Sequence, residues 1–322
     1  MTRYAAIKGL RFLFCLGIVV TFQFLIPRLM PGSPVINLTG PDGMGLSEKT
    51  YQEMERELGL DLPLQSQFLN HIKELSSMNM GFSWFYHEPV TNVITRHISP
   101  TIRIVLPAAV LSAFLSMIFG SLAGRYPGKA VDILITSSFI TLYAIPAFLT
   151  AMICLALLSF TWSIFPLGGL GGTDMEPGSF SWWADIVNHM TLPVVVLALS
   201  TAGPKCLVMR NRVVEESEKD YVVFSRARGM DEYRILFVHI LRNACIPVVS
   251  LIGLDFGFIL SGALLVEIVF SINGMGSLIH EAAMNRDYPV LQGCFLLLSL
   301  VVLSVNFLVD IITGILDPGT QA

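Results

Sequence analysis

The sequence predicts an all-α integral membrane protein with six transmembrane helices, and three observations carry this prediction. Hydrophobic residues make up 53% of the 322 residues, and charged residues only 14%. The mean hydropathy is +0.67, which exceeds what an ordinary soluble domain shows. Several runs without Asp, Glu, Lys or Arg reach about 20 residues, the length at which a helix crosses the hydrocarbon core. A net charge of −4 gives no overall basic field, so nucleic acid is not an expected partner.

The six expected spans follow from where charged residues are missing. Five runs contain none: 12–27, 104–124, 133–173, 186–204 and 288–309. A sixth run, 243–266, is interrupted by Asp255 alone. The run 133–173 is too long for one helix, but Pro166 and the glycines after it end the helix early. We therefore expect one span over about 133–162, kinked near Pro146.

The N-terminal run and the basic residues set the expected topology. Three basic residues before the first run imitate a signal peptide, but no small-residue cleavage site follows, so we expect a retained transmembrane helix over 1–30. The N-terminus, the 125–131 turn and the 205–242 loop together hold 13 Lys and Arg, against 7 in the segments between them. Since cytoplasmic loops carry the excess of Lys and Arg, both termini are expected in the cytoplasm.

The segment 31–100 is expected to be a small helical region on the opposite side, between the first two transmembrane helices. Ser47 is a predicted N-cap of a polar helix that Gly59 ends, and Pro63 opens a second helix over about 63–76. A region of this size is too small for an independent enzyme domain. After it, we expect a core of five helices over 101–316 and a C-terminal tail over 317–322.

The loop 205–242 has a helix–glycine–helix pattern. Ser217–Arg228 is expected to form a short helix that Gly229 ends, and a second helix runs from about Asp231 to Arg242. Cytoplasmic topology alone explains the arginines of this loop, but not the glycine or the apolar residues between them. We therefore interpret the first helix as a docking helix for a partner protein.

The amino-acid sequence of this loop resembles that of a known family. Asp220-Tyr221, Arg226-Ala227-Arg228-Gly229 and Leu241-Arg242-Asn243-Ala244 resemble the cytoplasmic loop of ABC-importer permeases of the dipeptide/oligopeptide/nickel family. His239 and Leu241 occupy the Ile and Leu places of the general importer pattern. Further similar segments are Leu58-Gly-Leu-Asp-Leu-Pro-Leu64, Gly81-Phe-Ser83, Glu267-x-Val-Phe270 and Arg286-Asp-Tyr-Pro-Val290. Ile272-Asn273 departs from the family, where Trp-Pro is expected.

The resemblance implies a type I ABC importer fold in the inner (plasma) membrane, with this chain as one of two homologous permease subunits. The implied partners are the second permease, two ABC ATPase subunits, an extracytoplasmic substrate-binding protein and membrane lipid. The implied substrates are peptides, with nickel or metallophore complexes as the alternative. ATP and magnesium would bind the ATPases, and this chain would hold no cofactor. The residues implied to couple it to the ATPases are Asp220, Tyr221, Phe224, Arg226, Ala227, Arg228, Gly229, His239, Arg242 and Asn243.

Asp255 is the charged residue inside a predicted span that most needs an explanation. An acid at mid-depth costs roughly 2.5–3.5 kcal/mol on insertion scales, so we expect it to face a polar path or a partner. A substrate-path role and a structural role in a hydrogen bond or a subunit-interface ion pair both remain open. Gly253, Gly257 and Ser261 form a small-residue stripe suited to close helix contact.

The sequence contains no complete motif for ATP hydrolysis, zinc-dependent proteolysis or nucleophilic catalysis. Gly124-x-x-x-Gly128-Lys129-Ala130 is one residue short of a phosphate loop and lacks its Ser or Thr. His280-Glu-Ala-Ala-Met284 has Met where a zinc protease needs its second histidine, so no metal site is expected. No nucleophile elbow occurs. The alternative from another class is an ion-coupled secondary transporter using Asp255, but the inverted repeats and paired broken helices of that class are missing from the sequence.

Overall fold

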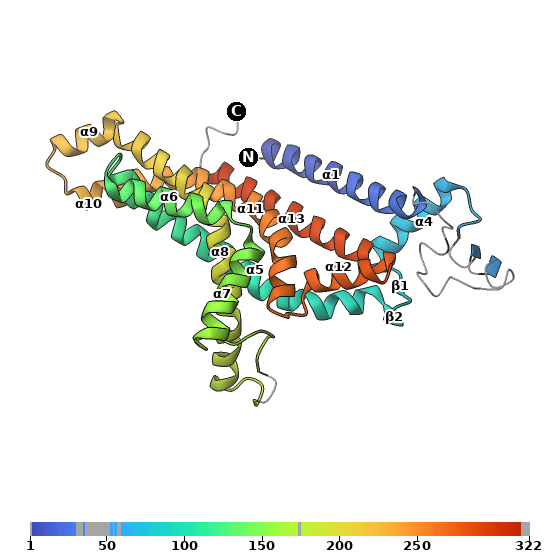
Figure 1. The fold of residues 1–322 in the computed structure, drawn as a ribbon. Helices are drawn as coiled ribbons and strands as arrows, with labels where there is room; N and C mark the ends of the chain where they lie inside the picture. The colour runs from blue at the N-terminus through green and yellow to red at the C-terminus, as the bar shows by residue number, and fades with distance from the viewer. Residues whose placement is uncertain are drawn as a thin grey trace. The chain divides into compact units, whose positions relative to one another are not determined.

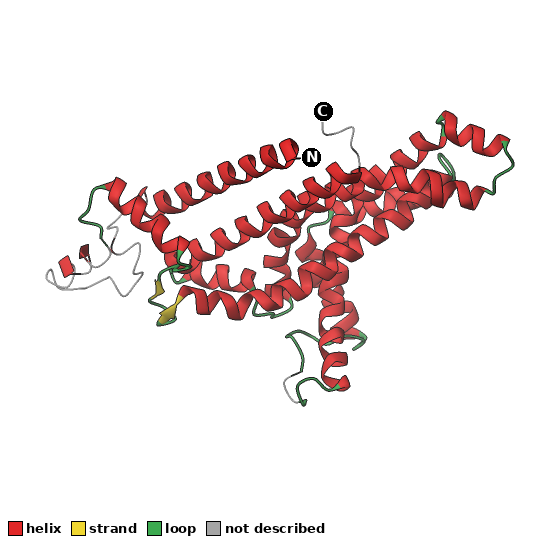
Figure 2. Cartoon of the chain, turned by 180° about the vertical axis from the view of Figure 1, so that it is seen from behind, coloured by secondary structure: helices red, strands yellow, loops and turns green. Residues whose placement is uncertain are grey.

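The computed structural model describes residues 2–29, 35, 52–53, 55–56, 59–172 and 175–316, and this part of the chain is mostly helical (Figure 2). It divides into two compact units that we describe separately. The first unit comprises Met1–Ala6, Ile102–Ile272 and Val305–Ala322, and the second comprises Ile7–Thr101 and Asn273–Ser304. The coupling residues predicted above all belong to the first unit.

The elements follow one another along the chain as labelled in Figure 1. In order they are α1 (Thr2–Leu29), α4 (Leu64–Ser76), β1 (Phe82–Ser83), β2 (Glu88–Pro89), α5 (Val90–Arg125), α6 (Ala130–Ala144), α7 (Ala147–Cys154), the π-helix η2 (Leu155–Thr161), α8 (Phe180–Ser217), α9 (Asp220–Ala227), α10 (Glu232–Arg234), the π-helix η3 (Ile235–Ile240), α11 (Leu241–Val269), α12 (Met275–Met284) and α13 (Tyr288–Leu316). Strands β1 and β2 pair antiparallel, with Phe82 opposite Pro89.

Five described helices are long and apolar enough to cross a membrane, and a bent helix pair makes a sixth candidate. The five are Ile7–Ile26, Val90–Arg125, Phe180–Ser217, Glu232–Gly253 and Tyr288–Ile315. The span expected over 133–162 with a kink is more sharply broken than predicted, because α6 and the α7–η2 segment meet at 99°. Pro146 has no N–H to donate, and Ile145 before it is extended at φ −85° and ψ 126°, as a residue before proline prefers.

The structure also corrects the extent of the loop 205–242. Helix α8 continues through residue 217, and the second helix runs from Glu232 through η3 into α11 without a break. Pro204 and Pro247 are both tolerated inside helices. The short helix begins at Asp220, rather than at Ser217 as predicted. Only residues 218–219 and 228–231 of this region are outside helices.

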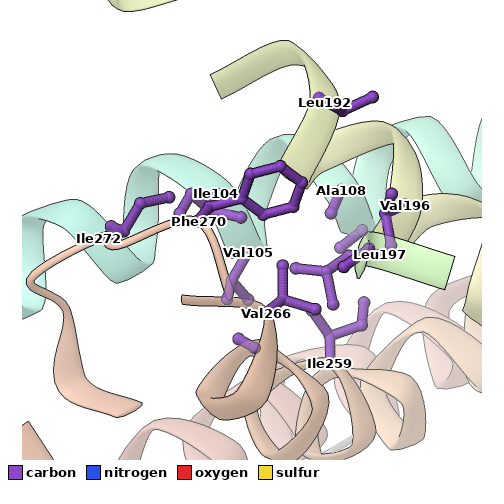
Figure 3. Packing of buried hydrophobic residues seen from close by; sticks show 13 residues of the cluster. Ile104, Val105, Ala108, Leu192, Val196, Leu197, Ile259, Val266, Phe270 and Ile272 are labelled. Atoms are coloured by element: carbon purple, nitrogen blue, oxygen red, sulfur yellow. The ribbon is translucent and has the colours of Figure 1, made fainter. Parts of the chain in front are cut away.

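The first unit is built around α8. Buried side chains of α5, α8 and α11 form one apolar cluster, in which Ile104 and Val105 meet Leu197 and Val266 (Figure 3). Helix α5 approaches α8 at Gly120, where an added Cβ would lie 2.6 Å from the Cys206 carbonyl oxygen. Small residues that let helix backbones approach are the usual means of packing within a membrane. The result is a closely packed α5–α8 pair.

The second unit shows why two of the family-like segments belong together. The Ser83 hydroxyl, in Gly81-Phe-Ser83, donates to the buried carboxylate of Asp287, in Arg286-Asp-Tyr-Pro-Val290. Asp287 also accepts from the Val290 backbone N–H at 3.3 Å, which caps the start of α13. The contact therefore attaches the β1–β2 hairpin to α13.

Of the two helices predicted within 31–100, the structure confirms the second. The helix expected over about 63–76 is confirmed as α4, with Pro63 as its N-cap residue. Gly59 has φ +63°, which suits a glycine at the end of a helix. The predicted cap at Ser47 lies outside the described residues.

Candidate functional site

The predicted coupling residues gather at the end of the first unit, where α9 lies between the ends of α8 and α11 (Figure 1). Helix α9 is amphipathic over a single turn. Val222 is fully buried, whereas Val223 and Phe224 are 54% and 70% exposed. The cluster that receives Val222 comprises Met209, Val213, Ile235, Ile240, Ala244 and Val248. Burial on one face anchors α9 to α8, η3 and α11 and leaves its other face open.

Gly229 ends α9 as predicted, in a left-handed conformation with φ +74°. The Met230 N–H donates to the Ser225 carbonyl at 3.2 Å, and the Gly229 N–H donates to the Arg226 carbonyl at 2.9 Å. These two bonds make a Schellman motif, which satisfies carbonyls that the end of a helix leaves unpaired. Met230 then packs against the apolar cluster beneath α9.

Helix α9, the turn at Gly229 and the α10–η3 segment together form a helical hairpin, which we call the α9 hairpin. Its second arm begins at Asp231, also as predicted. Its carboxylate accepts the backbone N–H groups of Tyr233 at 3.0 Å and Arg234 at 3.3 Å, which caps the helix start. The Tyr233 ring lies under the Arg125 guanidinium at 4.7 Å, so this arm also contacts the end of α5.

Arg226 holds the two arms together. Its Nε donates to Glu232 Oε1 at 2.8 Å, and its Nη1 donates to the Ser217 carbonyl at 3.4 Å. Both side chains of the ion pair are about half exposed, at 43% and 53%. Such pairs contribute roughly 0.2–1 kcal/mol, so the value of this one lies in fixing the geometry of the hairpin.

The open side of the hairpin is apolar. Five of its large apolar side chains are more than half exposed: Val223, Phe224, Tyr233, Phe237 and Val238. We call these five residues the hairpin surface. Val223 and Phe224 lie on α9, outside the candidate spans of the described helices, so a protein partner is the expected cover for these two. Tyr233, Phe237 and Val238 belong to the candidate span Glu232–Gly253.

The remaining residues predicted to couple the permease to the ATPases lie on α9, η3 and the start of α11. Asp220 lies in the first turn of α9, where a carboxylate is favoured by the helix dipole. Ala227 is the last residue of α9, and Arg228 is its C-cap. His239 lies in η3, and Arg242 is exposed in the first turn of α11.

Sequence analysis missed Glu216, which joins two of the predicted residues. Its buried carboxylate accepts from Lys219 Nζ, from the Tyr221 hydroxyl and, at 3.5 Å, from Asn243 Nδ2. Asn243 Nδ2 also lies 3.2 Å from the Tyr221 hydroxyl oxygen. The hydrogen bond to Glu216 raises the pKa of Lys219, and burial together with the same carboxylate raises the pKa of Tyr221.

Two charged residues of α8, Arg210 and Lys205, were also missed. Arg210 Nη2 pairs with the buried Asp132 Oδ2 at 2.6 Å, and the same oxygen accepts the Gly128 N–H at 2.8 Å. This pair attaches the α5–α6 turn to α8. Lys205, which sequence analysis placed at the start of a loop, is 1% exposed inside α8 and donates to the Thr201 carbonyl at 2.9 Å.

Asp255 lies within α11, as its predicted span requires, but its side chain is outside the described residues. Its proposed place in the substrate path stays a prediction. Near it, an added Cβ at Gly253 would lie 2.9 Å from Asn306 Oδ1 and 3.1 Å from Val309 Cβ. The close helix contact expected at this glycine is therefore confirmed, between α11 and α13.

Comparison with known proteins shows to which protein family the chain belongs. Residues 116–322, well over half of the chain, match the family described as the inner membrane component of binding-protein-dependent transport systems. The chain belongs to this family. It is accordingly a multi-pass inner-membrane permease subunit of an ATP-driven importer, and partner subunits supply ATP hydrolysis and substrate binding.

Individual members of the binding-protein-dependent transport family align over nearly the whole chain. It is 31% identical to the dipeptide transport system permease protein DppB of Escherichia coli K12, covering 93% of this chain and 92% of that protein. It is 32% identical to a di/tripeptide transport system permease protein of Pseudomonas aeruginosa UCBPP-PA14, covering 93% of both. A probable peptide ABC transporter permease protein of Sinorhizobium fredii is 30% identical, covering 94% of both.

Solved structures agree on the fold. A chain of the inward-facing MetNI methionine ABC transporter superposes with a TM-score of 0.57 at 14% identity, covering 70% of this chain and 97% of that one. At this identity the likeness concerns the fold alone, which is that of a type I importer permease.

Proposed function

We propose that this permease forms half of a translocation path for peptides and that its α9 hairpin receives a partner ATPase. Peptides are favoured because the relatives reported above are named for dipeptide, di/tripeptide and peptide transport. The proposed complex pairs this chain with a homologous second permease, two ATPases that bind ATP and magnesium, and an extracytoplasmic binding protein.

The observation that carries the coupling role is the two-sided character of α9. Val222 is fully buried beneath it, while Phe224 is 70% exposed above it. A rigidly anchored helix with an open aromatic side chain is suited to fill a groove on another protein, where such a residue can contribute a large part of the binding energy. Val223, beside it on α9 and 54% exposed, extends this contact.

The mechanism proposed from this arrangement is mechanical. When ATP binding draws the two ATPases together, the groove that holds Phe224 moves, and α9 moves with it. Because α9 is packed on α8 and α11, its displacement tilts helices that cross the membrane and alternates access to the path.

A single substitution tests the docking surface. Phe224→Asp places a charge in the proposed groove, so ATPase recovered with the purified permease should fall about tenfold or more, and peptide uptake should fall with it. Phe180→Asp is the matched control, because Phe180 is 89% exposed at the start of α8, far along the helix from the hairpin. Normal ATPase recovery with Phe224→Asp would contradict the coupling role of α9.

A further inference from the structure

The carboxylate of Glu216 lies where three helices of the coupling region meet. It sits in the last turn of α8, with the residue 5% exposed. One oxygen accepts from Lys219 Nζ in the α8–α9 turn. The other accepts from the Tyr221 hydroxyl of α9 and, at 3.5 Å, from Asn243 Nδ2 of α11. One side chain therefore connects α8, α9 and α11 through polar contacts.

These contacts differ in kind from the packing beneath them. The apolar cluster under α9 is held by close contact, which has no preferred direction. Hydrogen bonds to a buried carboxylate are directional and are strengthened by the charge, and loss of a donor leaves the acceptor unsatisfied. The Glu216 contacts are thus suited to fix the position of α9 against the start of α11.

The contacts around Glu216 bear on where a displacement of α9 would reach the neighbouring helices. Helix α8 is closely packed against α5 at Gly120, and the Asp132–Arg210 pair holds the α5–α6 turn on it. Helix α11 meets the carboxylate through its third residue, Asn243, and continues to Asp255. A displacement of α9 would therefore pass to α11 at its N-terminal end.

We propose that Glu216 is a positioning residue that transmits the movement of α9 to α11, through Tyr221 and Asn243. This inference rests on the proposed coupling role of α9 and adds the residue through which coupling leaves that helix. It also explains why Asp220-Tyr221 and Leu241-Arg242-Asn243-Ala244 occur in the same loop: their Tyr and Asn side chains meet at one carboxylate.

The test uses the whole complex, with ATPases and binding protein, in lipid vesicles. Glu216→Gln keeps the size of the side chain but removes its charge and leaves one acceptor oxygen for three donors. We expect the amount of ATPase bound to change less than about twofold and peptide uptake to fall about tenfold, while ATP hydrolysis continues. The ATP hydrolysed per peptide imported should rise accordingly. Glu218→Gln, an exposed glutamate two residues away, is the matched control.

A second variant follows the same connection from the other side. Tyr221→Phe removes the hydroxyl that donates to Glu216 and should raise the same ratio, by less than Glu216→Gln. The double variant should be no worse than Glu216→Gln alone, because both changes break one connection.

Two results would overturn the proposal. One is a wild-type ratio of ATP hydrolysed to peptide imported in Glu216→Gln. The other is loss of the ATPase from that variant, which would make Glu216 a support for the hairpin surface only. Failure of the docking role would appear separately, as retained ATPase in Phe224→Asp.

Discussion

Among single residues, Gly229 shows what backbone conformation alone contributes to the proposed coupling region. Its φ is +74°, and no atom lies within 4 Å of the position that a Cβ would take. A side chain would therefore meet open space, and the penalty of replacing this glycine would come from the left-handed backbone alone. That conformation costs about 1–2 kcal/mol for most residues, but asparagine adopts it more readily.

Gly229→Val and Gly229→Asn should therefore behave differently. Valine is β-branched and resists φ near +74°, so the Schellman motif should open, and ATPase recovery and peptide uptake should fall severalfold. Asparagine should keep most of both activities. Both quantities can be measured on the same membranes, and equal loss in the two variants would show that the backbone conformation is not what matters here.

At the scale of the helices, α5 and α8 approach one another closely at Gly120. At Gly120 an added Cβ would lie 2.6 Å from the Cys206 carbonyl oxygen and 2.7 Å from Met209 Cβ. A backbone carbonyl cannot turn aside as a flexible side chain can, so any larger residue must separate the two helices. Overpacking of this kind typically costs about 1–3 kcal/mol.

Gly120→Ala should accordingly destabilise the permease, and its melting temperature in detergent should fall by several degrees. Gly17→Ala is the matched control, because Gly17 lies in α1 with nothing within 4 Å of an added Cβ. There alanine should be neutral or slightly stabilising, since it is the better helix former. A melting temperature unchanged in Gly120→Ala would show that α5 and α8 have room to separate.

Sequence reasoning succeeded where the signal is local. The apolar runs located the spans, Gly229 and Asp231 marked the hairpin, and Pro146 marked the break before α7. The end of α8 was misjudged because 205–217 carries polar residues that apolar periodicity cannot assign to a membrane helix. Glu216 was missed because its partner Asn243 is 27 residues away. Asp132 and Arg210 are 78 residues apart in the sequence, so no local pattern predicts their contact either.

At the scale of the whole molecule, the point of interest is how the part of the chain before the family match is attached to the rest. The match begins at residue 116, inside α5. Helix α1, α4 and the β1–β2 hairpin precede it, and this part is attached to the C-terminal third within the second unit. There Gln23 Nε2 donates to the Gln292 carbonyl at 2.9 Å, and Gln292 Nε2 donates to the Gln23 carbonyl at 2.6 Å. Paired amides of this kind join helices inside a membrane, where water cannot replace them.

Membrane orientation is the prediction that tests this arrangement as a whole. From the distribution of Lys and Arg we predict that both termini and the α9 hairpin lie in the cytoplasm, and 31–100 on the other side. In a cysteine-free background, Glu218→Cys should react with a membrane-impermeant thiol reagent only in inside-out vesicles. Glu55→Cys should react only in intact spheroplasts, because three membrane crossings separate the two positions, made by α5, by the bent α6–η2 segment and by α8. Reaction of both cysteines from the same side would require that the bent α6–α7 segment, whose halves meet at 99°, enters and leaves the membrane on one face. The hairpin surface would then lie outside the cytoplasm, where no ATPase could reach it.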